Sequence, residues 1–269
     1  MQIAAAKIEI AASVLNPYGS NLVLSVMTEA PIPAHLAPAP PRGEGVWIGL
    51  VIMGLWACKL AVALAMPIDW ASPWTYVLVL LLTHLYTGMF ITAHDAMHGL
   101  VSAAKGLNRA IGTLAALLFA YNWYPTLLAN HQKHHAYAAQ SQDPDWHPGG
   151  FWVWYLSFAR HYITWWQIAA MAVTYNLAKL WLPAENLILF WMVPAVASTF
   201  QLFYFGTYLP HKGDHAPADP HRARSQGLGH AWAFATCYFF GYHHEHHAMP
   251  WLPWYKLPSA RAFTAQAEA

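Results

Sequence analysis

Two long apolar stretches near the start of the chain restrict its fold more than any other feature. They are VWIGLVIMGLWACKLAVALAM at 46–66 and WTYVLVLLLTHLYTGMFITA at 74–93. Each has the length of about 20 mostly apolar residues that a helix needs to cross a bilayer. Two further apolar blocks, at about 165–182 and 187–208, flank a second short turn. Because a short turn makes two helices antiparallel neighbours, the sequence predicts an all-α integral membrane protein with four transmembrane helices in two hairpins.

The composition agrees with a membrane protein, since only 9% of the residues are charged and 57% are hydrophobic. A soluble domain carries about 25% charged residues. The formal net charge of +1 excludes a general attraction to nucleic acid.

The four predicted spans would leave the N-terminal arm, residues 94–160 and residues 209–269 on one face of the membrane. The turns at 67–73 and 183–186 contain Asp69 and Glu185 but no Lys or Arg, whereas the three polar regions are rich in both. The positive-inside rule therefore predicts that this face is cytoplasmic and carries a helical cap. The apolar block at 107–128 is predicted to be a helix that lies along this interface.

Residues 31–41, PIPAHLAPAPP, contain five prolines and are typical of an extended linker. We therefore expect a flexible N-terminal extension and linker at 1–42, a catalytic domain at 43–262 and a tail at 263–269. Met27 is an alternative start, in which case the residues before it contribute little to function.

Eight of the 17 histidines form three tight clusters, and a ninth follows the fourth apolar block. Residues i, i+3 and i+4 of a helix share a face, so each cluster is expected to point all its rings at one place. Nine nitrogens are too many for one four-coordinate zinc and suit two metal ions with open positions for an oxygen species. The expected metal ligands are His94, His98, His131, His134, His135, His211, His243, His246 and His247.

The spacing excludes two common metal sites. A zinc protease needs H-E-x-x-H, and Ala248 stands where the second histidine of a motif beginning at His244 would be. The Glu-x-x-His pairs of soluble di-iron carboxylate proteins are absent from the sequence. Sites made only of imidazole suit iron, copper or zinc, so copper remains an alternative on ligand chemistry. Clustering at a membrane favours two irons that handle oxygen.

Neighbouring residues are expected to support the site. A ligand histidine usually donates its second N–H to a carboxylate or a similar group. His84 is not an expected ligand; it lies within the second span and is expected to form a hydrogen bond inside the bundle. Predicted supporting residues are Asp95, Asp143, Asp145, His221, His244 and Glu245. The aromatic residues near the clusters are predicted to line an apolar substrate tunnel: Trp123, Tyr124, Tyr238, Phe239, Phe240 and Tyr242.

At these residues the chain resembles the membrane fatty-acid-desaturase-like superfamily, whose histidine boxes have the forms HxxxH, HxxHH and HxxHH. It is more specifically similar to bacterial carotenoid 4-ketolases over about residues 46–262. The segments that carry this similarity are HDAMHG at 94–99, DPDW at 143–146, FGTYLPH at 205–211, HRARS at 221–225, FFGYHHEHH at 239–247 and PWLPWYKLP at 250–258. The chain departs from the family at 136–138, where Ala-Tyr-Ala replaces further basic residues, which is expected to alter the substrate mouth.

The resemblance implies an enzyme with two iron ions that uses O2 to place keto groups at C4 and C4′ of β-ionone rings. β-Carotene would give echinenone and canthaxanthin, and hydroxylated rings would lead to astaxanthin. Two hydroxylations at one carbon followed by loss of water would form each ketone. The resemblance also implies a ferredoxin-like electron donor with its reductase, and a place among the lipids of a bacterial inner membrane.

Three alternatives stay open at this stage. A fatty-acyl desaturase or a carotenoid hydroxylase would share the same histidine site. A metal transporter would place its ligands near the bilayer midplane, whereas these clusters lie at the ends of the predicted spans.

Overall fold

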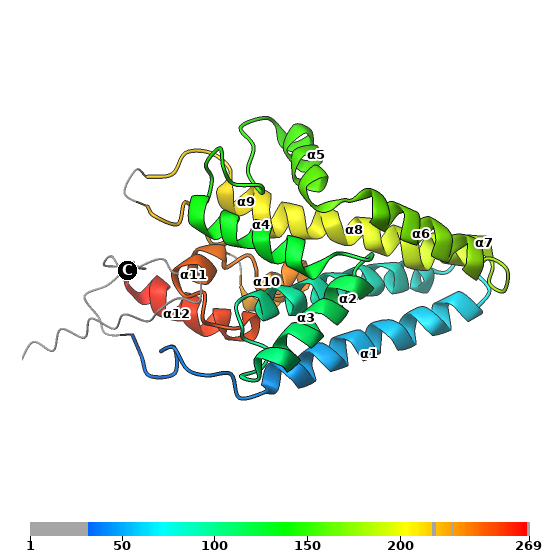
Figure 1. Ribbon diagram of the computed structural model, residues 1–269, viewed down its shortest axis with the longest axis horizontal. Coiled ribbons are helices and arrows are strands. Elements are labelled where there is room, and N and C mark those ends of the chain that lie inside the picture. Colours follow the sequence, from blue (N-terminus) through cyan, green and yellow to red (C-terminus); the bar gives the residue numbers. More distant parts are fainter. Residues whose placement is uncertain (1–31, 217–218, 228, 268–269) are drawn as a thin grey trace, which may run out of the picture.

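The computed structural model describes residues 32–216, 219–227 and 229–267, and this part of the chain is helical without strands (Figure 1). Three helices among the described residues are long and apolar enough to cross a membrane: α1 (Glu44–Ala65), α2 (Pro73–Met97) and a composite helix, Ala184–His211. The composite helix contains α7 (Ala184–Asn186), the π-helix η1 (Leu187–Met192), α8 (Val193–Leu202), the π-helix η2 (Phe203–Tyr208) and α9 (Leu209–His211).

Local sequence sets the ends of these helices. α1 ends at Ala65, close before Pro67, which cannot continue a helix, and Pro73 begins α2 in its first turn. The side-chain amide of Asn186 donates hydrogen bonds to the carbonyl oxygens of Ala63 and Met66, at 2.9 and 2.6 Å. These bonds satisfy carbonyl groups that the end of α1 leaves unpaired, and they fix the start of the composite helix beside it.

The expected fourth span is shorter than the prediction required. α6 (Trp165–Ala178) has 14 residues, about 21 Å at 1.5 Å per residue, against a hydrocarbon core of about 30 Å. It starts at a capping box between Thr164 and Gln167, just after the polar end of α5 (Phe151–Tyr162). The four-span prediction is therefore not confirmed by the helices alone.

The apolar block at 107–128 forms parts of two helices rather than one. α3 (Lys105–Leu118) packs against α2, and Gly112 lies so close to Ala96 that a Cβ there would come within 2.5 Å of the alanine methyl. Ala120 and Tyr121 then adopt left-handed backbone conformations with φ of 52° and 58°. α4 (Tyr124–Tyr137) begins after this break and carries the second histidine cluster.

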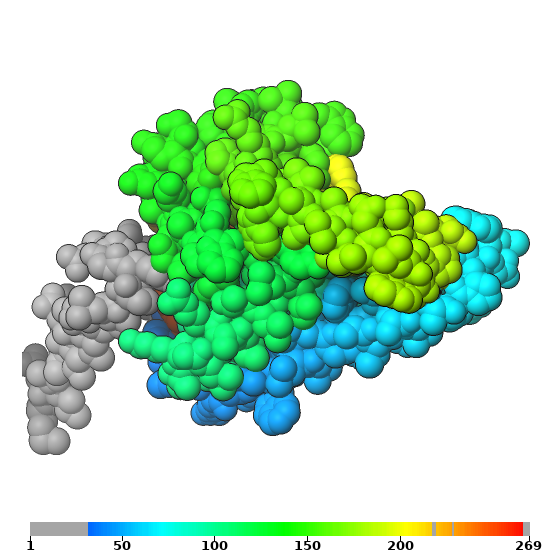
Figure 2. Space-filling view, turned by 45° about the vertical axis from the view of Figure 1, so that its right-hand side comes forward, coloured from blue at the N-terminus to red at the C-terminus, as the bar shows by residue number. Residues whose placement is uncertain are grey.

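The remaining helices gather at the end of the bundle where α2 and α9 finish (Figure 1). They are α10 (His230–Cys237), α11 (His243–Ala248), the 3₁₀ helix η3 (Trp254–Lys256) and α12 (Leu257–Ala267). The opposite, narrow end is formed by the α1–α2 turn, cyan in Figure 2, and the nearby yellow-green α6–α7 segment. The third histidine cluster, on α11, therefore meets the ends of α2 and α9.

Part of the proline-rich segment before α1, which the sequence predicts to be a linker, packs against residues near the C-terminal end of the chain. Leu36 is fully buried against Met249, Leu252 and Ala260. The indole N–H of Trp251 also donates to the Leu36 carbonyl oxygen at 2.9 Å. At the other end, the predicted tail begins as a continuation of α12 through Ala267. Residues 1–31, including both candidate start positions, lie outside the described residues.

Replacing Leu36 by alanine is expected to destabilise the fold by about 2 kcal/mol, because the deletion leaves a cavity in a small cluster. Ile32→Ala is the matched control, since Ile32 precedes the same turn and is 37% exposed. Unfolding of both variants in detergent, followed against denaturant, measures the difference. Equal stability of the two variants would contradict the contact.

Candidate metal centre

All nine expected ligand histidines lie at this end of the bundle, and they form two groups. In each group the nitrogen atoms that could bind a metal lie within 4.8 Å of one another. The first group contains His94, His98, His131, His135 and His246. The second group contains His134, His211, His243 and His247. Each group takes residues from three separate helical segments, so neither can form before the ends of the bundle have packed.

The second and third sequence clusters are each divided between the two groups, which corrects the expectation that each cluster points to one place. On α4, His131 and His135 join the first group while His134 joins the second. On α11, His243 and His247 join the second group while His246 joins the first. Because a helix turns by about 100° per residue, i and i+4 nearly coincide in direction while i+3 and i+4 diverge. The HxxHH spacing thus serves two adjacent sites from one helix.

The distances between ring nitrogens fit metal coordination. In the first group, His98 and His131 Nε2 are 2.7 Å apart, and His135 and His246 Nε2 are 3.0 Å apart. In the second, His247 Nε2 lies 3.1 Å from Nε2 of both His134 and His243. Two nitrogens bonded at right angles to one ion, with bonds of about 2.1 Å, are about 3.0 Å apart.

Buried ring nitrogens without a hydrogen-bond partner are a second indication that this site binds cations. Both ring nitrogens of His94, His211 Nε2 and His243 Nδ1 are buried without a hydrogen-bond partner among the described residues. Burying a polar atom without a partner costs free energy, and metal ions would satisfy one ring nitrogen of His94 in the first group and His211 Nε2 in the second. The donor set therefore fits two metal ions, each held by imidazole.

The electrostatics keep most of these rings in the neutral, metal-binding form. Burial lowers the pKa of His98 to about 3. Burial, with repulsion from neighbouring imidazoles, also holds the pKa well below the usual value for His131, His135, His243, His246 and His247. His134 is the exception. Burial opposes its charge, but the charge and hydrogen bond of Asp143 outweigh burial and raise the pKa of His134 to about 9.

Asp143 orients His134. Its carboxylate oxygens lie 3.0 and 3.1 Å from His134 Nδ1, so this nitrogen donates its proton and Nε2 is left for the second group. The carboxylate itself is fixed by the backbone N–H groups of Ala139 and Asp145, at 2.9 and 2.8 Å. His211 is held in a similar way, because its Nδ1–H donates to the Arg222 carbonyl oxygen at 2.7 Å. Such contacts fix the ring orientation of metal ligands.

Two other predicted carboxylates lie differently. Asp95 Oδ1 is 3.8 Å from His94 Nδ1, too far for a hydrogen bond, and Asp95 Oδ2 accepts the backbone N–H of Trp254 at 3.2 Å. Glu245 is turned away from the histidine groups, contrary to its predicted role. Its buried carboxylate accepts hydrogen bonds from Ser225, Arg261 and Thr264, and so ties α11 to α12.

The two supporting histidines predicted from the sequence lie beside the second group rather than in it. His244 Nδ1–H donates to the Ala223 carbonyl oxygen at 3.1 Å. The His221 ring lies 5.6 Å from that of His244 and 6.4 Å from that of His247, centre to centre. His84 does not form the expected hydrogen bond within the part of the chain that the structure describes. Both its buried ring nitrogens lack a partner there, and its ring stacks on Tyr238 at 4.3 Å.

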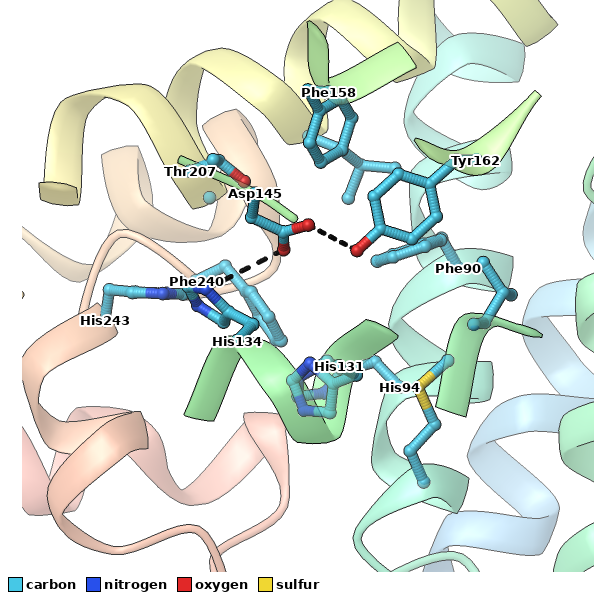
Figure 3. Close-up of a pocket in the computed structure, with 14 residues that line it drawn as sticks. Phe90, His94, His131, His134, Asp145, Phe158, Tyr162, Thr207, Phe240 and His243 are labelled. Carbon is cyan, nitrogen blue, oxygen red and sulfur yellow. Dashed lines mark hydrogen bonds and ion pairs between the residues drawn. The ribbon is translucent and has the colours of Figure 1, made fainter. Parts of the chain in front are cut away.

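A pocket meets both histidine groups on one side (Figure 3). His94 and His131 of the first group and His134 and His243 of the second line it. Its apolar wall is formed by Phe90, Met97, Leu127, Phe158, Leu202, Gly206 and Phe240. The free cavity is about 40 Å³, room for water-sized groups, so a larger ligand has to displace some of these side chains.

Of the six aromatic residues expected to line a tunnel, Phe240 alone lines this pocket. Its ring lies 4.5 Å from that of His94 and 5.4 Å from that of His246. Trp123 is half exposed, Tyr238 stacks on His84, and the Tyr242 hydroxyl lies 2.7 Å from His230 Nδ1. The remaining two pack elsewhere: Tyr124 against Gly112 and Phe239 against Trp254.

Three polar side chains also line the pocket: Asp145, Tyr162 and Thr207. The Tyr162 hydroxyl donates to the Asp145 carboxylate, and Asp145 Oδ2 lies 3.9 Å from His134 Nδ1. Burial raises the pKa of Asp145 to about 6. No sequence motif marks Tyr162 or Thr207 as a pocket residue. Thr207 lies in a segment that carried the family resemblance, whereas nothing in the sequence marks Tyr162.

Comparison with known proteins agrees with this site. The family model for Fatty acid desaturase matches residues 71–166 and 156–268. The chain therefore belongs to the fatty acid desaturase family. A β-carotene ketolase of Paracoccus sp. (strain PC1) is 41% identical over 224 residues, which cover 80% of this chain and 87% of the relative. A zeaxanthin 4-ketolase of Chlamydomonas reinhardtii is 38% identical over 82% of this chain, and the chain spans about half of that longer protein (54%).

Two further relatives support membership of this family. A β-carotene ketolase of Haematococcus lacustris is 38% identical over 70% of this chain and 62% of its own length. A chloroplastic omega-6 fatty acid desaturase of Brassica napus is more distant, at 26% identity. Within the family the chain thus groups with the β-carotene ketolases, which makes it an oxidoreductase and not a transporter.

Proposed function

We propose that this enzyme is an O2-dependent di-iron carotenoid ketolase that acts at C4 and C4′ of β-ionone rings. β-Carotene then gives echinenone and canthaxanthin, and rings that already carry a hydroxyl group lead to astaxanthin. One observation carries the proposal: two histidine groups open on a single, mainly apolar pocket in a chain 41% identical to a β-carotene ketolase. An apolar pocket beside the site suits a hydrocarbon ring.

The group of five and the group of four histidines would each hold one iron ion, which supplies the activation of O2. The protein prepares this site with its own residues. Asp143 and the Arg222 carbonyl keep the Nδ1 protons of His134 and His211 in place, so that the Nε2 atoms face inward. Phe240 packs on His94 and His246 and excludes water from that side of the pocket.

The overall reaction needs electrons from outside the chain. Each hydroxylation replaces one C4–H bond by C4–OH and consumes one O2, two electrons and two protons, with one water released. A second hydroxylation at the same carbon gives a geminal diol, and loss of water leaves the ketone. A ferredoxin-like one-electron carrier with its reductase is the proposed source of the electrons.

The positions of the helix ends support a fourth membrane crossing within the proposed catalytic domain, 43–262. α2 and the composite helix both finish at the histidine groups, where His98 and His211 lie. The chain must therefore return to the far end between them, where Asn186 contacts the end of α1. α6 with its flanking residues would make that crossing. The basic residues at the histidine end support a cytoplasmic position in a bacterial inner membrane, where carotenoid enters from the lipid.

Expression in a β-carotene-producing bacterium tests the proposal. We expect echinenone and canthaxanthin in the pigment extract, and a His211→Ala variant at equal abundance should leave β-carotene unchanged. Hydroxylated carotenoids without any ketone would show a hydroxylase, and new double bonds in the membrane fatty acids would show an acyl desaturase. Iron analysis of the purified chain should give two ions, and copper in their place would overturn the di-iron assignment.

A further inference from the structure

The polar side chains of the pocket are gathered in one place. Asp145 lies between Tyr162, from the last turn of α5, and Thr207, from η2, as Figure 3 shows. The Tyr162 hydroxyl donates to Asp145, which leaves the lone pairs of the tyrosine oxygen free to accept a hydrogen bond. The wall around the three residues is otherwise apolar, apart from the histidines. A hydrocarbon ring has no donor or acceptor that could form a hydrogen bond with these three side chains.

Ketone formation passes through an intermediate that can form hydrogen bonds with them. After the first hydroxylation the ring carries an allylic alcohol, and the same carbon has to react again through its remaining hydrogen. A wholly apolar pocket would disfavour the new hydroxyl, because burying it without a partner costs free energy. The alcohol would then leave before the second reaction, and the enzyme would act as a hydroxylase.

We propose that Tyr162, Asp145 and Thr207 form a subsite for the hydroxyl group of this alcohol intermediate. The proposal rests on the proposed function. The alcohol donates its proton to the Tyr162 oxygen and accepts a hydrogen bond from the Thr207 hydroxyl, while Asp145 fixes the tyrosine. Asp145 is adjacent to His134, so the bound hydroxyl keeps the reacting carbon at the histidine groups.

The location of Thr207 strengthens the assignment. Thr207 is buried, and the structure gives its hydroxyl no hydrogen-bond partner among the described residues. It lies in a π-helical segment, a form that often occurs at functional sites, and this segment leads directly to His211. The composite helix thus contributes one residue to the subsite, Thr207, and one to the second histidine group, His211.

Two substitutions remove single hydroxyl groups without changing the shape of the pocket: Tyr162→Phe and Thr207→Val. Tyr155→Phe and Thr199→Val are the matched controls, since Tyr155 lies in α5 and Thr199 in the composite helix. The Tyr155 hydroxyl and Thr199 Oγ1 lie 2.7 Å apart, outside the pocket. In the β-carotene-producing strain, we expect Tyr162→Phe and Thr207→Val to raise the ratio of 4-hydroxy product to ketone by about tenfold. Tyr155→Phe and Thr199→Val should keep the wild-type ratio.

Binding to the metal-free protein gives a second readout that does not depend on turnover. Quenching of tryptophan fluorescence compares 4-hydroxy-β-carotene with β-carotene. We expect the wild type to bind the alcohol about fivefold more tightly, as one or two hydrogen bonds would give, and the two pocket variants to lose that preference. If a variant loses all turnover and its product ratio cannot be measured, its binding preference still tests whether the residue belongs to the subsite.

The outcomes separate the two proposals. A wild-type chain that makes no ketone contradicts the proposed function. A wild-type chain that makes ketone, with pocket variants that keep both the product ratio and the preference for the alcohol, overturns the subsite alone.

Discussion

Replacing His246 by alanine is expected to abolish ketone formation and to lower the iron content from two ions per chain toward one. His246 is the only residue that α11 contributes to the first group, and its Nε2 lies 3.0 Å from that of His135. Its ring also lies 4.6 Å from that of His94. The second group keeps all its histidines in this variant. Metal analysis of the purified chain and chromatography of the pigments measure the two effects.

His147→Ala is the matched control, because His147 belongs to neither group and its Nδ1 accepts the backbone N–H of Gly149 at 2.9 Å. This variant should keep both irons and most of its activity. Both variants should insert into the membrane in equal amounts, since neither position lies in a spanning helix. Full turnover of His246→Ala would remove this residue from the ligand set, and loss of both irons would show that the two groups do not load independently.

The histidines were predictable from the sequence because their helical spacing is a local property. Their division into two groups was not predictable, because it depends on the direction in which each ring points after α4 and α11 have packed against each other. His134 and His135 are adjacent in the chain, yet they belong to different groups. Tyr162 was missed for a related reason: its partner, Asp145, is reached only because α5 folds back beside α4.

Hydropathy predicted α1, α2 and the composite helix, because lipid-facing helices need long apolar runs. It could not predict the break after α3, where two non-glycine residues, Ala120 and Tyr121, adopt left-handed conformations without a sequence signal. Nor could it predict the burial of Leu36. The surface that covers this residue comes from residues near 250, more than two hundred positions away.

Replacing Asp143 by asparagine is expected to weaken iron binding in the second group by about 10- to 100-fold, the usual effect of losing a carboxylate that supports a ligand histidine. Asparagine has nearly the same shape, but its single carbonyl oxygen can accept only one of the two backbone N–H groups, of Ala139 and Asp145, that bond to different oxygens of the Asp143 carboxylate. It lacks the negative charge that raises the pKa of His134 and makes its Nε2 a stronger ligand. Titration of the loaded protein with a chelator, followed by iron analysis, measures the change.

Asp219→Asn is the matched control for this substitution. Asp219 also lies near a histidine, with its carboxylate 3.9 Å from His215 Nδ1, but that histidine belongs to neither group. If the charge of Asp143 acts through His134, only Asp143→Asn should release iron early, and one of the two ions should leave first. Equal chelator resistance of the two variants would contradict this role. Ketone formation should fall together with the iron of the second group, because the pocket touches both groups and the proposed reaction uses both.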